Sequence, residues 1–375
     1  MACVLLTLGL LTVGLWPFNP FPLNRATWLP GRHGVRLSEH SQIFSPGAML
    51  ASAQTLPGSF CSLEVQLMTE LHDFRNAGTI LGFYTPDNPL QFRLMQYNDE
   101  LLIRKDYQDE HNRRKTIELE LEHALVKGQP VTFTITAGSD GVTAYRNGVL
   151  AGNSPKMKLS CADFSGQLII GNSPVTENSW RGTLLKVSAY DQSLSPLQVS
   201  HYYQFHSNDL SELSQDSVSD HRIAEYTFTE GSGRTIHNRA GAAPDLRMPE
   251  RFRTLHRQFL IWPWEETGDK LELRDIAINV VGFVPFGFLV LAYLRLIRGN
   301  PHALLITVLS GFTISLTIEI LQTFIPERGS GILDVFTNTF GTYLGAWLFQ
   351  RPGMQNFILQ WRLFTGPQPP SEIEE

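Results

Sequence analysis

The sequence predicts an α+β multidomain protein, in which a four-span transmembrane helical bundle is combined with an all-β sandwich of the jelly-roll type. Two apolar runs of about 20 residues, separated by the polar turn 325–331, are each long enough to cross a bilayer as a helix. The middle of the chain instead alternates apolar and polar residues in short runs divided by Gly, Asn, Asp and Pro, which is typical of strands joined by turns.

Composition agrees with two kinds of domain in one chain. The 375 residues leave room for two or three domains. Charged residues make up 18% of the chain, below the ~25% of soluble domains, yet the mean hydropathy of −0.10 is low for a pure membrane protein. The net charge of −6 and the lack of a basic stripe in the sequence argue against nucleic acid as a partner.

The first predicted span covers residues 1–17, which are nearly all apolar; the alternative is the core of a signal peptide. No Lys or Arg precedes the apolar run, and Pro17 follows it in place of a small-x-small cleavage site. Both features favour a retained helix. Trp16, Phe18 and Phe21 then suit an interfacial aromatic belt.

The sandwich, with flanking strands, is predicted within residues 30–250. The clearest alternating segments are 62–68, 79–84, 90–97, 101–107, 116–120, 131–137, 141–146 and 184–190. Asn147-Gly148 predicts a two-residue hairpin turn, because both positions tolerate positive φ. Ser195-Pro196 predicts the start of a short helix to about residue 203. Residues 207–220 are expected to be a polar linker, and 223–246 a strand pair that completes or flanks the sandwich.

The remaining spans are expected within 275–350. They cover about 276–296, 303–324 and 332–349, preceded by a connector at 251–274 and followed by a tail at 351–375. Aromatic residues of the connector that suit the membrane interface are Phe259, Trp262 and Trp264.

The basic residues of the short loops predict the topology. They are Arg295 and Arg298 after one span, and Arg351 and Arg362 after another. Because short cytoplasmic loops are enriched in Lys and Arg, both termini are expected in the cytoplasm and the sandwich outside the membrane.

The predicted spans carry acid and amide side chains that a lipid-facing helix would avoid. Glu319 and Gln322 lie three residues apart, and the pairs Asp334/Asn338 and Asp275/Asn279 lie four apart, so each pair shares a helix face. A carboxylate at membrane depth costs at least ~2.5 kcal/mol, so it normally faces protein or a wet cavity. We therefore predict an intramembrane binding cluster; its candidate residues are Asp275, Asn279, Glu319, Gln322, Arg328, Asp334 and Asn338.

Two roles for this cluster remain open. In one, Glu319 and Asp334 hold a polar headgroup or act as acid and base. In the other, the cluster is structural: the side chains bond across helices, Asp334 pairs with Arg328, and Asp275 favours a helix amino terminus. Gly341 and Gly345 form a G-x-x-x-G pattern, for which close helix packing is expected.

The cysteines match neither a metal site nor a dense disulfide scaffold. There are three: Cys3, Cys61 and Cys161. Outside the membrane, Cys61 and Cys161 would lie in an oxidising compartment and could bridge. Two buried thiols in strands are the alternative.

Two stretches of the helical region resemble the VanZ-like membrane family. One is Glu319-x-x-Gln322, Ile325-Pro326-x-Arg328 and Asp334-x-x-x-Asn338-x-x-Gly341. The other runs from Asp275 through Asn279 and Pro285 to Gly287. The resemblance implies a bacterial membrane protein and an association with glycopeptide-type antibiotic resistance.

The alternating region resembles a LamG-like, concanavalin A-like jelly roll. The similarity lies in the strand 34–38, the hairpin Tyr145-Arg-Asn147-Gly148 and the closing segment 182–196. It implies a domain that binds sugars or proteins. Aromatic residues that could stack on sugar rings, or else belong to the core, are Tyr84, Tyr97, Tyr107 and Trp180.

The sequence contains no soluble-enzyme motif such as G-x-S-x-G, H-E-x-x-H or a P-loop, so no catalytic residue, metal or cofactor is predicted. Glu118 and Glu120 share a strand face, but such acids are usually solvated. The first hypothesis is a non-enzymatic envelope protein whose outer sandwich binds cell-wall or exported polysaccharide. The alternative is a membrane enzyme or lipid-carrier handler that engages a lipid-linked wall precursor through Glu319, Arg328 and Asp334.

Overall fold

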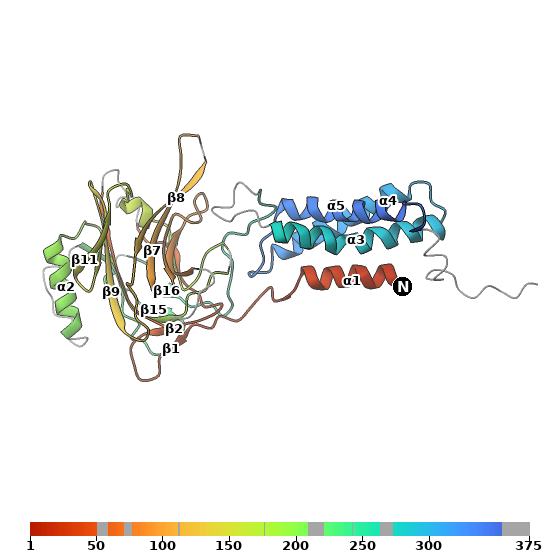
Figure 1. Cartoon of the computed structure of the whole chain (residues 1–375). Helices are drawn as coiled ribbons and strands as arrows, with labels where there is room; N and C mark the ends of the chain where they lie inside the picture. Colours follow the sequence, from red (N-terminus) through yellow and green to blue (C-terminus); the bar gives the residue numbers. More distant parts are fainter. Residues whose placement is uncertain are drawn as a thin grey trace, which may run out of the picture. The chain divides into compact units, whose positions relative to one another are not determined.

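The computed structural model describes residues 1–50, 59–70, 77–111, 113–175, 177–208, 221–241, 243–262 and 273–354, with only the backbone at 205–208. The chain forms two compact units: Phe21–Arg257, here the sandwich unit, and Met1–Pro20 with Gln258–Glu375, here the helical unit (Figure 1). Several sequence predictions lie outside the described residues: Trp264, Arg362, most of the 207–220 linker, residues 263–272 of the connector and residues 355–375 of the tail.

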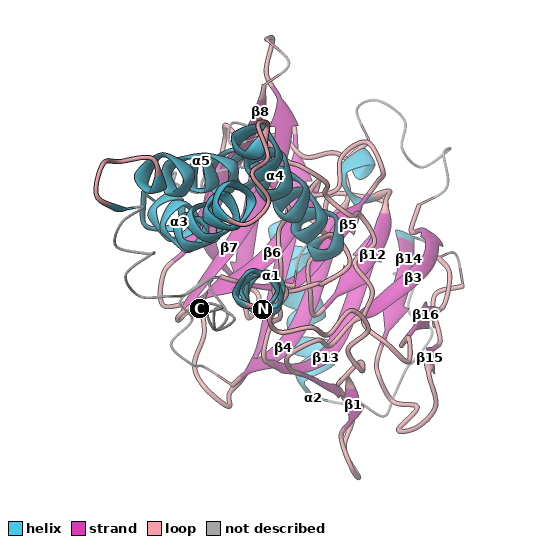
Figure 2. Cartoon of the chain, turned by 90° about the vertical axis from the view of Figure 1, so that its right-hand side faces the viewer, coloured by secondary structure: helices cyan, strands magenta, loops and turns pink. Residues whose placement is uncertain are grey.

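In its described residues, the sandwich unit contains two antiparallel sheets. The first runs in the order β1 (Thr27–Trp28), β2 (Val35–Leu37), β13 (Gly182–Tyr190), β4 (Ser62–Thr69), β9 (Pro130–Gly138), β10 (Gly141–Arg146) and β11 (Val149–Ser154), with β14 (Arg222–Tyr226) also paired to β13. The second runs β15 (Thr235–Ile236), β16 (Leu246–Arg247), β3 (Ile43–Ala48), β12 (Gln167–Ile170), β5 (Gly78–Tyr84), β6 (Phe92–Tyr97), β7 (Glu100–Gln108) and β8 (Arg114–Leu121) (Figure 2). The predicted all-β sandwich is confirmed.

Alternation along the strands builds the core between the sheets. Val65 and Phe133 of the first sheet and Phe83, Leu94 and Ile103 of the second belong to one buried cluster. Successive strand residues point to opposite faces, so the apolar positions of both sheets meet. The hairpin predicted at Asn147-Gly148 joins β10 to β11, with φ of 52° and 78° at these two residues.

Later segments complete both sheets, as the sequence predicts for 223–246. Strand β14 pairs with β13, and β16 pairs with β3. The helix α2 (Pro196–Asn208) begins at the predicted proline and extends further than expected. Its Val199 and Tyr202 pack on Tyr145 and Tyr190.

Charged side chains are buried on the other face of the first sheet. Lys186 of β13 lies 3.3 Å from Glu64 of β4 and 3.4 Å from Glu225 of β14. Arg222 also pairs with Glu225, at 2.8 Å. The two cations offset the two carboxylates, which burial without partners would make costly.

A disulfide joins Cys61, just before β4, to Cys161 at the start of the short 3₁₀ helix η2 (Cys161–Phe164). Their Cα atoms are 4.9 Å apart and the two residues are 100 positions apart in sequence. Closing a loop of that length removes much of the freedom of the unfolded chain. Cys3 is a free thiol in the helical unit.

The described residues of the helical unit form four helices: α1 (Ala2–Gly14), α3 (Leu273–Leu296), α4 (Ala303–Gln322) and α5 (Ile332–Phe349) (Figure 1). Among the described helices, α3 and α4 are long and apolar enough to cross a membrane, whereas α1 is a shorter apolar helix. The helices thus stand where the sequence predicts them, and length and composition support two of the four expected spans.

Small residues bring α3 and α5 into close contact. Gly341 lies against the carbonyl of Val280, and Gly345 against that of Val284. A Cβ at either glycine would overlap the facing backbone. The packing role expected for the G-x-x-x-G pattern is confirmed, and the register shows that α3 and α5 run parallel.

Candidate functional site

The acid and amide pairs of the three longer helices gather at one end of the helical unit. The pairs lie near the start of α3, the end of α4 and the start of α5. Since α4 runs antiparallel to its two neighbours, the end of α4 meets the starts of α3 and α5. Chain direction and short loops therefore assemble residues that are up to 59 positions apart in sequence, from Asn279 to Asn338.

Polar contacts join the three helices at this end. Asn279 Nδ2 of α3 donates to Asp334 Oδ1 of α5 at 2.8 Å. Asn338 Nδ2 of α5 donates to Ser315 Oγ of α4 at 2.9 Å. The Ser315 hydroxyl in turn lies 3.5 Å from the backbone oxygen of Asp334. Hydrogen bonds of this kind hold helices together where water is excluded.

Glu319 is the most deeply buried acid of the cluster, with 1% of its surface exposed. Its Oε2 accepts a hydrogen bond from Gly331 N at 2.9 Å, and the Ser330 hydroxyl also bonds the carboxylate. No Lys or Arg among the described residues forms an ion pair with Glu319. The 323–331 loop thus supplies neutral donors to this carboxylate, and Asp334 adds a second nearby negative charge.

The same loop holds the end of α1. Gln322 Nε2 donates to the carbonyl of Gly14 at 2.8 Å. Arg328 donates through Nε, at 2.9 Å, and through Nη2 to the carbonyl of Trp16. Carbonyls at a helix carboxyl end lack partners within the helix, so these side chains satisfy groups that would otherwise need water.

A short segment after the sandwich unit also fastens this loop. Ile261 N donates to the Ser330 carbonyl at 2.9 Å, and Ile332 N donates to the Ile261 carbonyl at 3.1 Å. Leu260 N donates to Ser330 Oγ at 3.2 Å. Ser330 is therefore fixed on both its backbone and its side chain, which positions the donors that face Glu319.

Two buried oxygen atoms of the cluster have no hydrogen-bond partner among the residues that the structure describes. They are Oε1 of Gln322 and Oδ1 of Asn338. Their residues are 8% and 5% exposed. A buried polar atom without a hydrogen bond is costly, so two such atoms beside two carboxylates call for an explanation.

The structure brings together five of the seven candidate residues: Asn279, Glu319, Gln322, Asp334 and Asn338. Asp275 is exposed at the start of α3. Arg328 is also exposed, and its guanidinium binds Trp16. Sequence reasoning missed Ser315 and Ser330. Ser315 could have been found, because it lies four residues before Glu319 on one helix face; Ser330, in a loop, gives no periodic signal.

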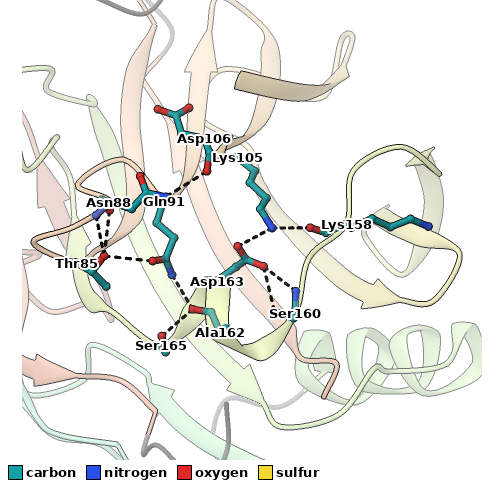
Figure 3. A network of polar contacts seen from close by, with 10 residues as sticks. All are labelled: Thr85, Asn88, Gln91, Lys105, Asp106, Lys158, Ser160, Ala162, Asp163 and Ser165. Atoms are coloured by element: carbon teal, nitrogen blue, oxygen red, sulfur yellow. Dashed lines mark hydrogen bonds and ion pairs between the residues drawn. The ribbon is translucent and has the colours of Figure 1, made fainter. Parts of the chain in front are cut away.

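A polar network in the sandwich unit is the other prominent cluster (Figure 3). Lys105 Nζ lies 2.8 Å from Asp163 Oδ1 and donates to the Lys158 carbonyl at 2.7 Å. Gln91 Nε2 donates to the Ala162 carbonyl at 2.7 Å. These groups bind one another and tie η2, beside the disulfide, to β7 and the 85–91 loop. The network therefore has a structural role.

The four aromatic candidates of the sandwich have different environments. Trp180 is fully buried and donates through Nε1 to Gln96 Oε1 at 2.6 Å. Tyr84 packs against His256, with ring centroids 6.2 Å apart. Tyr97 and Tyr107 remain 39% and 41% exposed. Since Tyr97 pairs with Glu100, Tyr107 lies seven residues further along β7, roughly 23 Å away.

Comparison with known families agrees with both units. Residues 224–355 match the family model described as VanZ/LLP1. The chain contains a VanZ-like domain. Residues 75–200 match the model of the concanavalin A-like lectin/glucanases superfamily. Both resemblances noted in the sequence are confirmed, and the VanZ match extends from β14 through α5.

One characterised relative is Protein VanZ of Enterococcus faecium. It is 35% identical over 98 residues, which are 26% of this chain and 56% of that protein, so the chain spans about half the length of the relative it matches.

Similar solved structures include a putative carbohydrate binding protein from Bacteroides ovatus, with 12% identity over 62% of both chains and a TM-score of 0.39. Another is a heptameric SAP-like pentraxin from Limulus polyphemus, with 17% identity, a TM-score of 0.34, and coverage of 61% of this chain and 94% of that one.

Proposed function

We propose that this VanZ-like protein is a multi-pass membrane protein of the bacterial envelope, whose sandwich unit lies outside the cytoplasmic membrane and binds cell-wall or exported polysaccharide. The observation that supports the membrane location is that the helical unit buries polar side chains and exposes apolar ones. The observation that supports the sugar part is the match of residues 75–200 to a superfamily that is named for lectins and glucanases.

Helix α5 illustrates how the helical unit buries polar side chains and exposes apolar ones. Its polar residues Asn338 and Thr342 are buried, whereas Phe336, Phe340 and Trp347 are exposed. A helix on the surface of a soluble domain has the opposite arrangement, with its apolar face buried. The pattern supports α5 as a span in contact with lipid, although its composition alone does not identify it as one.

Helix α1 also offers an apolar outer surface. Val4, Leu5 and Leu8 are exposed, while its Leu10 packs against a cluster that contains Phe283. Its 13 residues extend about 20 Å at 1.5 Å per residue, less than the ~30 Å hydrocarbon core. We propose that α1 lies in the membrane beside α3 and α4.

The positions of basic residues support the topology. Arg295 lies in the last turn of α3 and Arg298 just after it, and Arg351 follows α5, where it stacks on Trp347 at 3.9 Å. Because α3 and α5 are parallel, these cations lie at the same end, which the positive-inside rule places in the cytoplasm. The polar cluster then faces the outer side, both termini are cytoplasmic, and the disulfide-bearing sandwich is exported.

The acidic residues of β8 support a sandwich that binds polysaccharide and does not cleave it. Glu118, one of two acids that share a face of β8, forms an ion pair with Arg104 of the adjacent strand. A glycoside hydrolase needs a carboxyl pair that is free to act on the glycosidic bond. An acid held by arginine on a strand is instead a normal stabilising pair.

The test is polysaccharide binding by the full-length protein in phosphatidylcholine nanodiscs, on a glycan array and with fractionated wall polysaccharides. Saturable binding to one polymer is expected. Removing an exposed ring, in Tyr97→Ala or Tyr107→Ala, should weaken it by roughly 1 kcal/mol, or about five-fold, if that ring stacks on sugar. Tyr343→Ala, an exposed ring of the helical unit, is the control. Absence of binding by folded protein would refute the sugar-binding proposal.

A second candidate is the handling of a lipid-linked wall precursor, or catalysis on it, through Glu319, Arg328 and Asp334. The observation that favours it is the buried Glu319 carboxylate without an ion-pair partner among the described residues. Intramembrane acids of this kind are commonly functional. Glu319→Gln and Asp334→Asn should then abolish activity in protein that still inserts.

A further inference from the structure

We propose that the intramembrane polar cluster (Asn279, Ser315, Glu319, Gln322, Asp334 and Asn338) binds a headgroup that donates hydrogen bonds, as an ammonium or a sugar hydroxyl does, and not a phosphate. The inference rests on the proposed membrane location of the helical unit, but it does not depend on what the sandwich binds. It assigns the cluster a ligand class from its own donors and acceptors.

The donors of the cluster are already engaged. The amide nitrogens of Asn279, Asn338 and Gln322 donate to Asp334, Ser315 and the Gly14 carbonyl, respectively. Gly331 N and the Ser330 hydroxyl bond Glu319. Every one of these groups therefore has a protein acceptor.

The groups left over are acceptors. Gln322 Oε1 and Asn338 Oδ1 are buried and accept no hydrogen bond from the described part of the chain. The Glu319 carboxylate has two oxygens with room for several hydrogen bonds, more than Gly331 N and the Ser330 hydroxyl supply. A ligand that donates hydrogen bonds satisfies these oxygens, whereas a phosphate, which only accepts at neutral pH, leaves them unpaired.

Charge points to the same ligand class. Glu319 and Asp334 are neighbouring acids that act on each other electrostatically, and no ion pair to Glu319 is formed by the described cations. A cationic headgroup would offset them, and a phosphate would add to the repulsion.

Arg328 does not change this conclusion. Its Nε and Nη2 both bind the Trp16 carbonyl, so the protein occupies one of the two faces through which the guanidinium can bind a phosphate with a pair of N–H groups. Arg328 is also exposed, whereas the acceptors Glu319, Gln322 and Asn338 are buried.

The test uses the full-length protein in phosphatidylcholine nanodiscs, because the choline headgroup has no N–H donor. A minor lipid is added: phosphatidylethanolamine for the ammonium, monoglucosyldiacylglycerol for the hydroxyls, or phosphatidic acid for the phosphate. The readouts are retention of the minor lipid in native mass spectrometry and the midpoint of thermal unfolding.

We expect one of the two donor headgroups to be retained and to raise the midpoint, and the arm that responds distinguishes ammonium from hydroxyl. Glu319→Gln should weaken retention about ten-fold or more, because a hydrogen bond to a charged group contributes at least that factor. Asp275→Asn, which changes an exposed acid of α3, should bind like the natural protein.

The proposal is overturned if the protein retains phosphatidic acid preferentially and Arg328→Gln loses that retention. Equal retention of all three lipids also overturns it. If Glu319→Gln does not fold, competition among the three headgroups on the unmodified protein decides the question alone. Sugar binding by the sandwich is read on the glycan array, so the failure of one proposal is distinguishable from failure of the other.

Discussion

The tight α3–α5 contact gives the sharpest prediction for the helical unit. In Gly345→Ala, the new Cβ would meet backbone atoms of Val284 and Phe288, which cannot move aside as a flexible side chain could. The contrasting variant is Gly282→Ala in α3, where a Cβ meets nothing within 4 Å. Both replace a helical glycine with alanine, so only the packing differs.

The magnitude follows from the contact. Overpacking costs about 1–3 kcal/mol, and opening the seam by roughly 1 Å forfeits a further part of the dispersion attraction along it. Alanine recovers up to about 1 kcal/mol of helix propensity at either site. We expect Gly345→Ala to lose about 2 kcal/mol of unfolding free energy and Gly282→Ala to gain up to about 1 kcal/mol.

The assay is reversible unfolding of the helical unit within the full-length protein, by steric trapping or by titration with a denaturing detergent. A difference of about 3 kcal/mol between the variants corresponds to a factor of about 100 in the unfolding equilibrium constant. Equal stability of the two variants would show that α3 and α5 do not pack through Gly345, and would refute the reasoning.

Three further predictions concern the sandwich and the topology. In urea unfolding, Cys61→Ser or Cys161→Ser should remove about 4–5 kcal/mol, because the disulfide closes a loop of 100 positions. Glu225→Gln should cost about 3 kcal/mol, since it leaves Lys186 with one buried partner fewer. Although burial raises the pKa of Glu225, Lys186 and Arg222 lower it more, so its stabilising effect, present above its ordinary pKa near 4.5, is lost as pH falls through the lowered folded value. A fluorescent-protein reporter fused after Met354 should fluoresce in the cytoplasm, whereas an alkaline phosphatase reporter in the sandwich should be active.

Controls are available for each of these. Cys3→Ser changes a free thiol outside the sandwich and should leave its urea midpoint unchanged. Glu39→Gln removes an exposed partner of Arg25 and should cost at most about 1 kcal/mol. A pH profile of Glu225→Gln that falls as steeply in acid as that of the natural protein would argue against the assigned role of Glu225. An inactive phosphatase reporter in the sandwich would reverse the proposed sidedness.

The VanZ-like domain also makes antibiotic resistance testable as part of the proposed envelope role. Expression in a glycopeptide-sensitive host should raise the inhibitory concentration of a teicoplanin-type antibiotic, and Glu319→Gln should abolish the rise if the cluster is functional. An unchanged inhibitory concentration, with the protein shown to be in the membrane, would separate this chain from that role.

Local pattern was sufficient to predict much of the architecture. Alternation identified β4, β9, β10 and β13 of the first sheet and β5, β6, β7 and β8 of the second, and Asn147-Gly148 identified a hairpin, because these signals act between neighbouring residues. It did not identify the edge strand β1 or the strand β3. Spacing of three or four placed Glu319 with Gln322, and Asp334 with Asn338, on shared helix faces. Helix order and short loops then required these faces to meet at one end.

The tertiary structure alone decided which partner each side chain takes. Arg328 binds the Trp16 carbonyl and Asp334 accepts from Asn279, because these pairings depend on helix rotation and depth, which spacing along one helix does not encode. Trp180 is buried while Tyr97 is exposed, although both are aromatic residues close to the end of a strand. Ser330 bonds Glu319 from a loop that Leu260 and Ile261, about 70 positions earlier in the chain, hold by hydrogen bonds. Periodicity specifies the face that a residue presents, and packing between distant segments specifies what that face meets.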